Sequence, residues 1–169
     1  ETLVNTYAMH WPGKQRETVR NLRKTPFHHA LKAHGACFAE VQGWERPGWF
    51  APEGVKAAYD YSFYRPSWFD HTQAEQKAAR EDVAMIDYTM LGKLMVEGAD
   101  AERFLDRMCT NKMSIAPGRV TYTLMLNDRG GIESDVTVAR HATDSFMVMS
   151  SISHTRRDYL HLRDAIQPD

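Results

Sequence analysis

The amino-acid sequence predicts an α+β fold, in which a mostly antiparallel sheet is covered by helices. Residues 119–140 contain two runs of alternating apolar and polar residues, separated by the turn-forming residues 127–131, which is typical of a β-hairpin. Elsewhere, segments with the 3.6-residue apolar spacing of helices are mixed with further strand-like runs. Tight hairpins mixed with helices favour antiparallel pairing over a parallel α/β arrangement.

Composition excludes several classes of function. The 169 residues are 43% apolar, with 21 basic and 22 acidic side chains and a net charge of −1, so no electrostatic attraction to nucleic acid or an anionic membrane is expected. The absence of an apolar run of roughly 18–20 residues gives no support to a membrane-spanning helix. Cys37 and Cys109 lack CxxC spacing, which indicates reduced thiols in a cytoplasmic compartment. The first residue is Glu1, so we expect a fragment or a processed piece.

The first part of the chain, residues 1–62, is expected to be an extended arm. Residues 1–24 are largely polar, and a short amphipathic helix is predicted from an N-cap at Thr25 to a closing Gly35. A strand follows over 37–41. Residues 43–50 mix aromatic side chains with proline and glycine, so regular structure is not expected there.

The second part, residues 63–169, carries a regular succession of elements. A capping box at Thr72 and Glu75 begins a helix that runs to about Ala84. The next elements are a strand over 91–97, a helix after Asp100, the hairpin, a strand over 145–149 and a helix after Ser153. Apolar spacing predicts the inward faces of the last two helices: Ala101, Phe104, Leu105 and Met108 on one, and Tyr159, Leu162 and Ile166 on the other.

The predicted hairpin brings together two side chains that could take part in catalysis or binding. With a four-residue loop over 127–130, Leu126 lies opposite Gly131, and counting back along both strands places Tyr122 opposite Asp135. Asp135 is a charge within a run of β-forming residues. Its two interpretations are a solvated strand face and a functional carboxylate.

The hairpin sequence resembles a known family. The pattern Tyr-x-x-Met-Leu-Asn-x-x-Gly-Gly-Ile-x-x-Asp, kept from Tyr122 to Asp135, is similar to the folate-binding domain of the glycine-cleavage T-protein, an aminomethyltransferase. T-proteins usually carry two consecutive acids at the end of this pattern. Here the first is Ser134, so only Asp135 inherits the role of the acid.

A second resemblance covers nearly the whole chain. The strings Met-His-Trp-Pro over 9–12, Gly-Trp-Glu-Arg-Pro-Gly-Trp-Phe over 43–50 and Arg-Pro-Ser-Trp-Phe over 65–69 resemble the central region of dimethylglycine and sarcosine dehydrogenases. In that family, a flavin-dependent amine oxidase half is fused to a T-protein-like half. The resemblance implies that residues 1–62 link to the oxidase and that residues 63–169 begin the folate-binding domain.

The resemblance also implies site residues and cofactors. Tetrahydrofolate would receive the oxidised one-carbon unit as 5,10-methylenetetrahydrofolate, with Asp135 as the catalytic carboxylate and Tyr122 packed on the folate. Leu94 and Thr137 fall where wall residues of the pocket would lie. FAD would belong to the missing oxidase half, and Gly130-Gly131 lacks the strand–GxGxxG–helix context of a dinucleotide site. The remainder of the flavin enzyme is the expected partner, and a eukaryotic source would imply the mitochondrial matrix.

The sequence contains no pattern typical of a metal site or of a catalytic nucleophile. His28 and His29 are adjacent and diverge by about 100° on a helix, and no cysteine or carboxylate set completes a metal site with them. No Gly-x-Ser-x-Gly elbow marks a nucleophile. Two alternatives remain beside the folate-binding interpretation: a non-catalytic docking or structural fragment of such an enzyme, and a stand-alone aminomethyltransferase-like folate-binding protein.

Overall fold

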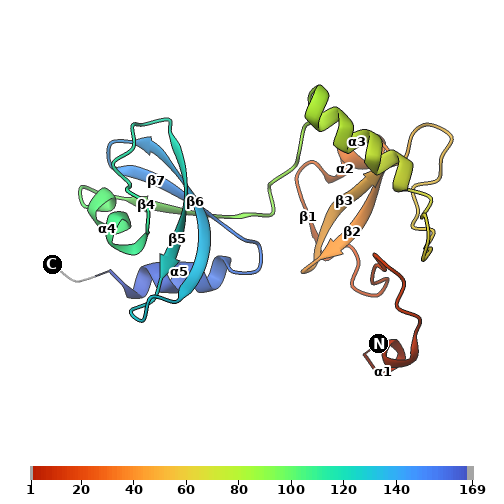
Figure 1. Ribbon diagram of the computed structural model, residues 1–169, viewed down its shortest axis with the longest axis horizontal. Helices are drawn as coiled ribbons and strands as arrows, with labels where there is room; N and C mark the ends of the chain where they lie inside the picture. The colour runs from red at the N-terminus through yellow and green to blue at the C-terminus, as the bar shows by residue number, and fades with distance from the viewer. Residues whose placement is uncertain (1, 167–169) are drawn as a thin grey trace. The chain divides into compact units, whose positions relative to one another are not determined.

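The computed structural model describes residues 2–166 and divides into two compact units, Glu1–Thr89 and Met90–Asp169 (Figure 1). The boundary therefore lies 27 residues later than the expected position after residue 62. The first unit is not an extended arm, because it contains its own sheet and a small core around Cys37, Trp49 and Ala51.

The first unit is built around a three-stranded sheet in the order β1-β3-β2. Its elements are α1 (Thr2–Tyr7), β1 (Arg23–Lys24), α2 (His28–Ala33), β2 (Ala36–Val41), β3 (Trp44–Phe50) and α3 (Phe69–Glu81). The expectation that residues 43–50 are irregular was wrong, since all of them except Gly43 belong to β3. Pro47 and Gly48 fit into the strand because the β2–β3 register shifts between Cys37 and Phe38, which leaves Gly48 without a cross-strand partner.

Gly48 also makes room for the packing of an aromatic side chain against β3. A Cβ atom at position 48 would lie 1.8 Å from the hydroxyl oxygen of Tyr59, so only glycine lets Tyr59 approach the strand. Tyr59 contacts Trp68 edge to face at a centroid distance of 4.9 Å, and Trp49 is 1% exposed. These aromatic residues pack within the unit and do not require an external surface.

Helices α2 and α3 of the first unit were predicted, but α1 was not, and the predicted N-caps of α2 and α3 were wrong. Both α2 and α3 start about three residues from the predicted N-caps, and neither Thr25 nor Thr72 caps its helix. Thr72 instead donates a hydrogen bond back to the carbonyl of Trp68, and Glu75 accepts one from the backbone of Phe50. The closing Gly35 is confirmed, with a φ of +85°.

The second unit is a four-stranded antiparallel sheet in the order β4-β7-β6-β5 with two helices (Figure 1). Its elements are β4 (Gly92–Glu97), α4 (Ala101–Met108), β5 (Val120–Leu126), β6 (Ile132–Ala142), β7 (Ser145–Ser150) and α5 (Thr155–Asp164). The predicted α+β class with mostly antiparallel pairing is confirmed.

One face of this sheet carries the core. Val136, Val138, Phe146 and Val148 from the strands pack with Leu105 of α4 and Leu162 of α5, and all six are at most 5% exposed. The predicted inward stripe of α4 is confirmed, because its four residues all belong to this cluster or pack on it. On α5 only Leu162 is inward: Tyr159 and Ile166 are 51% and 63% exposed, and the buried residue beside Leu162 is Asp158.

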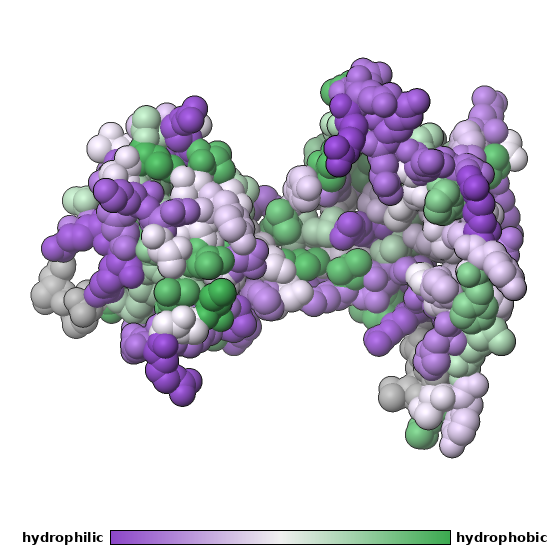
Figure 2. All heavy atoms as spheres, viewed as in Figure 1, coloured by the Kyte–Doolittle hydropathy of each residue, from purple (hydrophilic) through white to green (hydrophobic). Residues whose placement is uncertain are grey.

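Both described helices of this unit, α4 and α5, pack on the core face, so neither covers the opposite face of the sheet. Hydrophobic side chains reach the surface of the unit that contains β4–β7, between polar ones (Figure 2, green). Met95, Val120 and Tyr122 are each more than half exposed. We call this surface, formed by the outward residues of β4–β7, the open face. It combines apolar side chains with the predicted functional residues of the hairpin.

Candidate functional site on the open face

The hairpin of β5 and β6 forms as predicted, but its register differs. Tyr122 pairs with Thr137, and Asp135 pairs with Leu124. The expected direct opposition of Tyr122 and Asp135 was therefore wrong by two residues. The two side chains still lie on one face. Tyr122 points the same way as its direct partner Thr137, and Asp135, two residues from Thr137 on the same strand, points the same way as Thr137.

The difference has two local causes. The loop has five residues, since Leu126 pairs with Ile132, and the side-chain oxygen of Asn127 accepts hydrogen bonds from the backbone of Arg129 and Gly131 at 3.0 and 2.9 Å. In addition, Met125 pairs with Ser134, so Glu133 is an extra, bulged residue of β6. Loop and bulge each shift the register by one residue.

The bulge decides which way Asp135 faces. Without it, continuing the Leu126–Ile132 pairing would place Val136 opposite Tyr122, and Asp135 would turn toward the core. With it, the hydroxyl of Tyr122 donates a hydrogen bond to Asp135 Oδ2 at 3.3 Å. Slight desolvation and the neighbouring Asp135 charge raise the pKa of Tyr122 above its ordinary value of 10.0.

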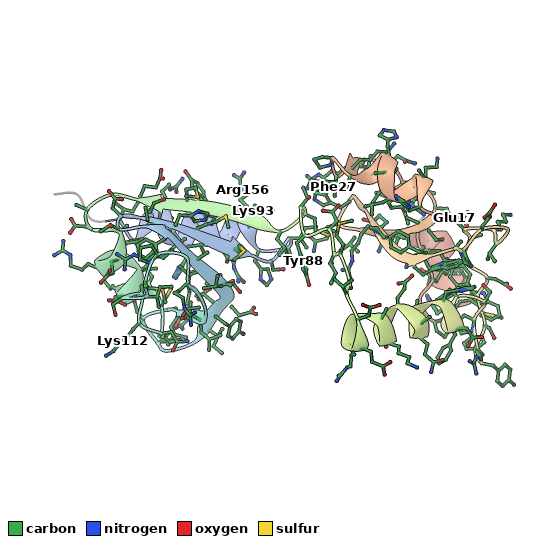
Figure 3. All side chains as sticks on the ribbon, turned by 90° about the horizontal axis from the view of Figure 1, so that it is seen from above. Glu17, Phe27, Tyr88, Lys93, Lys112 and Arg156 are labelled. Atoms are coloured by element: carbon green, nitrogen blue, oxygen red, sulfur yellow. The ribbon has the colours of Figure 1, made fainter. Side chains whose placement is uncertain are left out.

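A row of side chains crosses the open face through Thr137. Thr137 pairs with Tyr122 on one side and with Met149 on the other, and Met149 in turn pairs with Lys93 on β4. Figure 3 labels Lys93 on this edge strand. Sequence reasoning missed Met149 and Lys93, because only the order of the strands in the sheet brings them beside Tyr122 and Thr137.

Leu94 does not join this group. It pairs with Val148, which pairs with Val138, and both valines are fully buried on the core face. Leu94 packs against that core. The structure therefore brings Tyr122, Asp135 and Thr137 together and places Leu94 on the other side of the sheet, because adjacent residues of a strand point to opposite faces.

No group of three or more His, Cys, Asp or Glu side chains within residues 2–166 is arranged to hold a metal ion. None of the helices in this range combines the length and apolar character needed to cross a bilayer. Cys37 and Cys109 are free thiols, both buried.

The fold is shared with a solved structure. The glycine cleavage system aminomethyltransferase T from Bartonella henselae superimposes with a TM-score of 0.66 at 21% sequence identity, over 86% of this chain and 36% of that chain. This likeness confirms a T-protein fold. Residues 27–169 match the family model described as the GCVT N-terminal domain, so the chain belongs to that family. The match begins within the first unit, well before residue 63.

Two curated relatives that are named as enzymes are much longer than this chain. The chain is 45% identical to 4-methylaminobutanoate oxidase (formaldehyde-forming) of Paenarthrobacter nicotinovorans over 89% of its length, and 33% identical to human mitochondrial sarcosine dehydrogenase over 84%. It spans 18% of the length of each relative. The resemblance to the sarcosine and dimethylglycine dehydrogenases is thereby confirmed.

Proposed function

We propose that this chain is part of the tetrahydrofolate-binding region of a flavin-dependent demethylating dehydrogenase of the sarcosine or dimethylglycine type. The observation that carries the proposal is the hydrogen-bonded pair of Tyr122 and Asp135 on an uncovered, largely apolar sheet face. FAD and the amine oxidation belong to the rest of the enzyme. We also propose a cytoplasmic location, or the mitochondrial matrix if the source is a eukaryote; the word mitochondrial in the name of the human relative supports the second.

The residues of the open face fit a folate. A folate presents flat aromatic rings joined through amine nitrogens, and such rings bind well on apolar and aromatic side chains. Tyr122 and the half-buried Leu124 and Met149 supply these contacts, and Thr137 lies between Tyr122 and Met149 in the same row. Asp135 is the carboxylate of this surface that touches Tyr122.

Tetrahydrofolate supplies the two amine nitrogens that take up the one-carbon unit, giving 5,10-methylenetetrahydrofolate. When a formaldehyde equivalent condenses with the two nitrogens, two N–H protons leave with its oxygen as water. Asp135 is exposed and negatively charged, so it stabilises the cationic character that develops on the nitrogens and accepts a proton from them. The Tyr122 hydroxyl orients the carboxylate through Oδ2.

Titration of the protein with tetrahydrofolate tests the proposal. We expect saturable binding to the unmodified chain and weaker binding to Asp135→Asn and Tyr122→Phe. Asp144→Asn is the matched control, because Asp144 is also an exposed acid and lies in the β6–β7 turn of the same unit. Binding that is absent, or that weakens equally in Asp144→Asn and Asp135→Asn, would contradict the assignment of the open face.

A docking module is the second candidate. It is favoured by the exposure of Met95 and Val120 on the open face, since apolar sheet faces are normally covered. In that case the rest of the enzyme, and not folate, would cover these residues, and Asp135→Asn would leave methylene transfer unchanged. A stand-alone aminomethyltransferase-like folate-binding protein would bind folate without any flavin-containing partner.

A further inference from the structure

Helix α5, which packs on the core face of the sheet, carries an acid that the proposed function does not use. Asp158 of α5 is 1% exposed, and its Oδ2 atom accepts hydrogen bonds from two buried hydroxyls, Ser134 of β6 at 2.8 Å and Ser150 of β7. Its other oxygen, Oδ1, is buried without a hydrogen bond from the described residues and lies 3.5 Å from Arg157 Nε. A buried carboxylate is costly unless it is well bonded, so its presence requires an explanation.

The contacts of Asp158 and its neighbour converge on the bulge of β6. Ser134 is the first regularly paired residue after the bulged Glu133, and Asp135 follows it. Arg157 donates a hydrogen bond through Nη2 to the backbone carbonyl of Glu133. Two consecutive residues of α5 therefore hold the two consecutive residues of β6 that set the register of the hairpin.

We propose that Arg157 and Asp158 are positioning residues, which fix the bulge at Glu133 from the core side and thereby keep Asp135 on the open face beside Tyr122. The inference rests on the proposed function for its consequence in folate binding, but not for its structural content. A strand that loses a bulge slips by one residue, and a slip of one residue exchanges its two faces. Ser134 would then turn outward and Asp135 inward.

Two matched pairs of variants separate positioning from general stability. Ser134→Ala and Ser150→Ala each remove one buried hydroxyl from the same carboxylate oxygen, but only Ser134 lies beside the bulge. Arg157→Ala removes the contact with Glu133, and Arg156→Ala is its control at the neighbouring exposed arginine labelled in Figure 3. Because Arg157 is about half exposed, its loss does not threaten folding.

The readout is the pairing of β5 and β6, followed in the full chain by nuclear Overhauser contacts between Leu124 and Asp135 and between Tyr122 and Thr137. We expect these contacts to weaken in Ser134→Ala and Arg157→Ala and to persist in both controls, although both serine variants lower the melting temperature. Tetrahydrofolate affinity should fall on the order of tenfold in the first two variants only, which corresponds to about 1.4 kcal/mol.

The results of these experiments distinguish failure of the positioning proposal from failure of the proposed function. Pairing that persists in Ser134→Ala and Arg157→Ala would overturn the proposal and leave Asp158 with a purely structural role. Pairing that is lost equally in Ser150→Ala would overturn it as well, because the effect would not be specific to the bulge. If the unmodified chain does not bind tetrahydrofolate, the proposed function fails, and the pairing measurement alone decides whether Arg157 and Asp158 act as positioning residues.

Discussion

Tyr122 and Asp135 are diagonal neighbours across the β5–β6 ladder, joined by a 3.3 Å hydrogen bond although neither is the other's direct partner. A diagonal contact on one face of a sheet lies within reach of a long aromatic side chain, whereas a valine or serine in place of Tyr122 would be too short. The phenol therefore has a specific role in the pair.

Removal of the Asp135 charge should lower the pKa of Tyr122. A nearby carboxylate disfavours the tyrosinate, so Asp135→Asn brings the pKa of the phenol down toward its ordinary value of 10.0. Carbon NMR of labelled tyrosine, with Tyr122→Phe to identify the resonance among the seven tyrosines, measures the change. An unchanged titration in Asp135→Asn would show that the two side chains do not interact in solution.

In the full-length protein, Asp135→Asn should separate two activities. Loss of a catalytic proton acceptor typically costs roughly 10²–10⁴ in rate, so folate-dependent methylene transfer should fall by about 100-fold or more. Amine oxidation by the flavin should change little, because no flavin-binding pattern includes Asp135. Parallel assays of formaldehyde and methylenetetrahydrofolate distinguish this from a structural role, which would reduce both activities equally.

The buried ion pair of Arg20 and Glu45 should dominate the acid sensitivity of the first unit. Glu45 is 2% exposed and accepts hydrogen bonds from Arg20 and from the backbone of Asn21 at 2.6 Å. The Arg20 guanidinium holds the pKa of Glu45 below its ordinary value of 4.5. The resulting stability is present above that value and is lost as the pH falls through the lower folded-state pKa.

Glu45→Gln tests this ion pair. We expect a loss of roughly 2–3 kcal/mol in the free energy of unfolding near neutral pH and a weaker dependence on acid. All four tryptophans lie in the first unit, so tryptophan fluorescence reports its unfolding alone. Glu53→Gln, at an exposed acid of the same unit, is the control. A stability equal to that of the control variant would count against a contribution from the ion pair.

Both thiols should be unreactive in the folded protein. Burial raises the pKa of Cys109 to about 11, against a smaller opposing effect of its hydrogen bond with Thr123, and burial also raises the pKa of Cys37. Since the thiolate is the reactive species, a thiol-specific chromogenic reagent at pH 8 should react with neither residue until denaturant is added. Rapid modification of Cys109 in native buffer would show that its surroundings open readily.

Much of the fold could be predicted from local patterns. Alternation predicts β5, β6 and β7, and apolar spacing predicts α4 together with its inward face, because both patterns record which side of an element meets the core. The bulge at Glu133 was not predictable in this way. The alternation of residues 132–138 separates Val136 and Val138 from Asp135 and Thr137, but it does not show that an extra residue precedes them, because the bulge is defined by the pairing of β6 with β5.

Two other differences between the predicted and the observed structure also arise from contacts between residues distant in sequence. His28 of α2 and Asp158 of α5 are buried polar residues, and the apolar spacing of the sequence did not predict their burial. Their burial depends on partners distant in sequence: the ring of His28 stacks on Phe38 at a centroid distance of 4.2 Å, and Asp158 binds two serines of the sheet. Hydropathy patterns contain no information about such partners.

The bulged residue also constrains how this hairpin can vary in length among related sequences. Inserting or deleting a single residue between Leu126 and Ser134 would reverse the parity that the bulge sets, and the carboxylate would move to the wrong side of the sheet. Changes of two residues would preserve it. The turn is therefore expected to tolerate only even-numbered insertions and deletions, although as an exposed loop it would otherwise be among the most permissive segments of the chain.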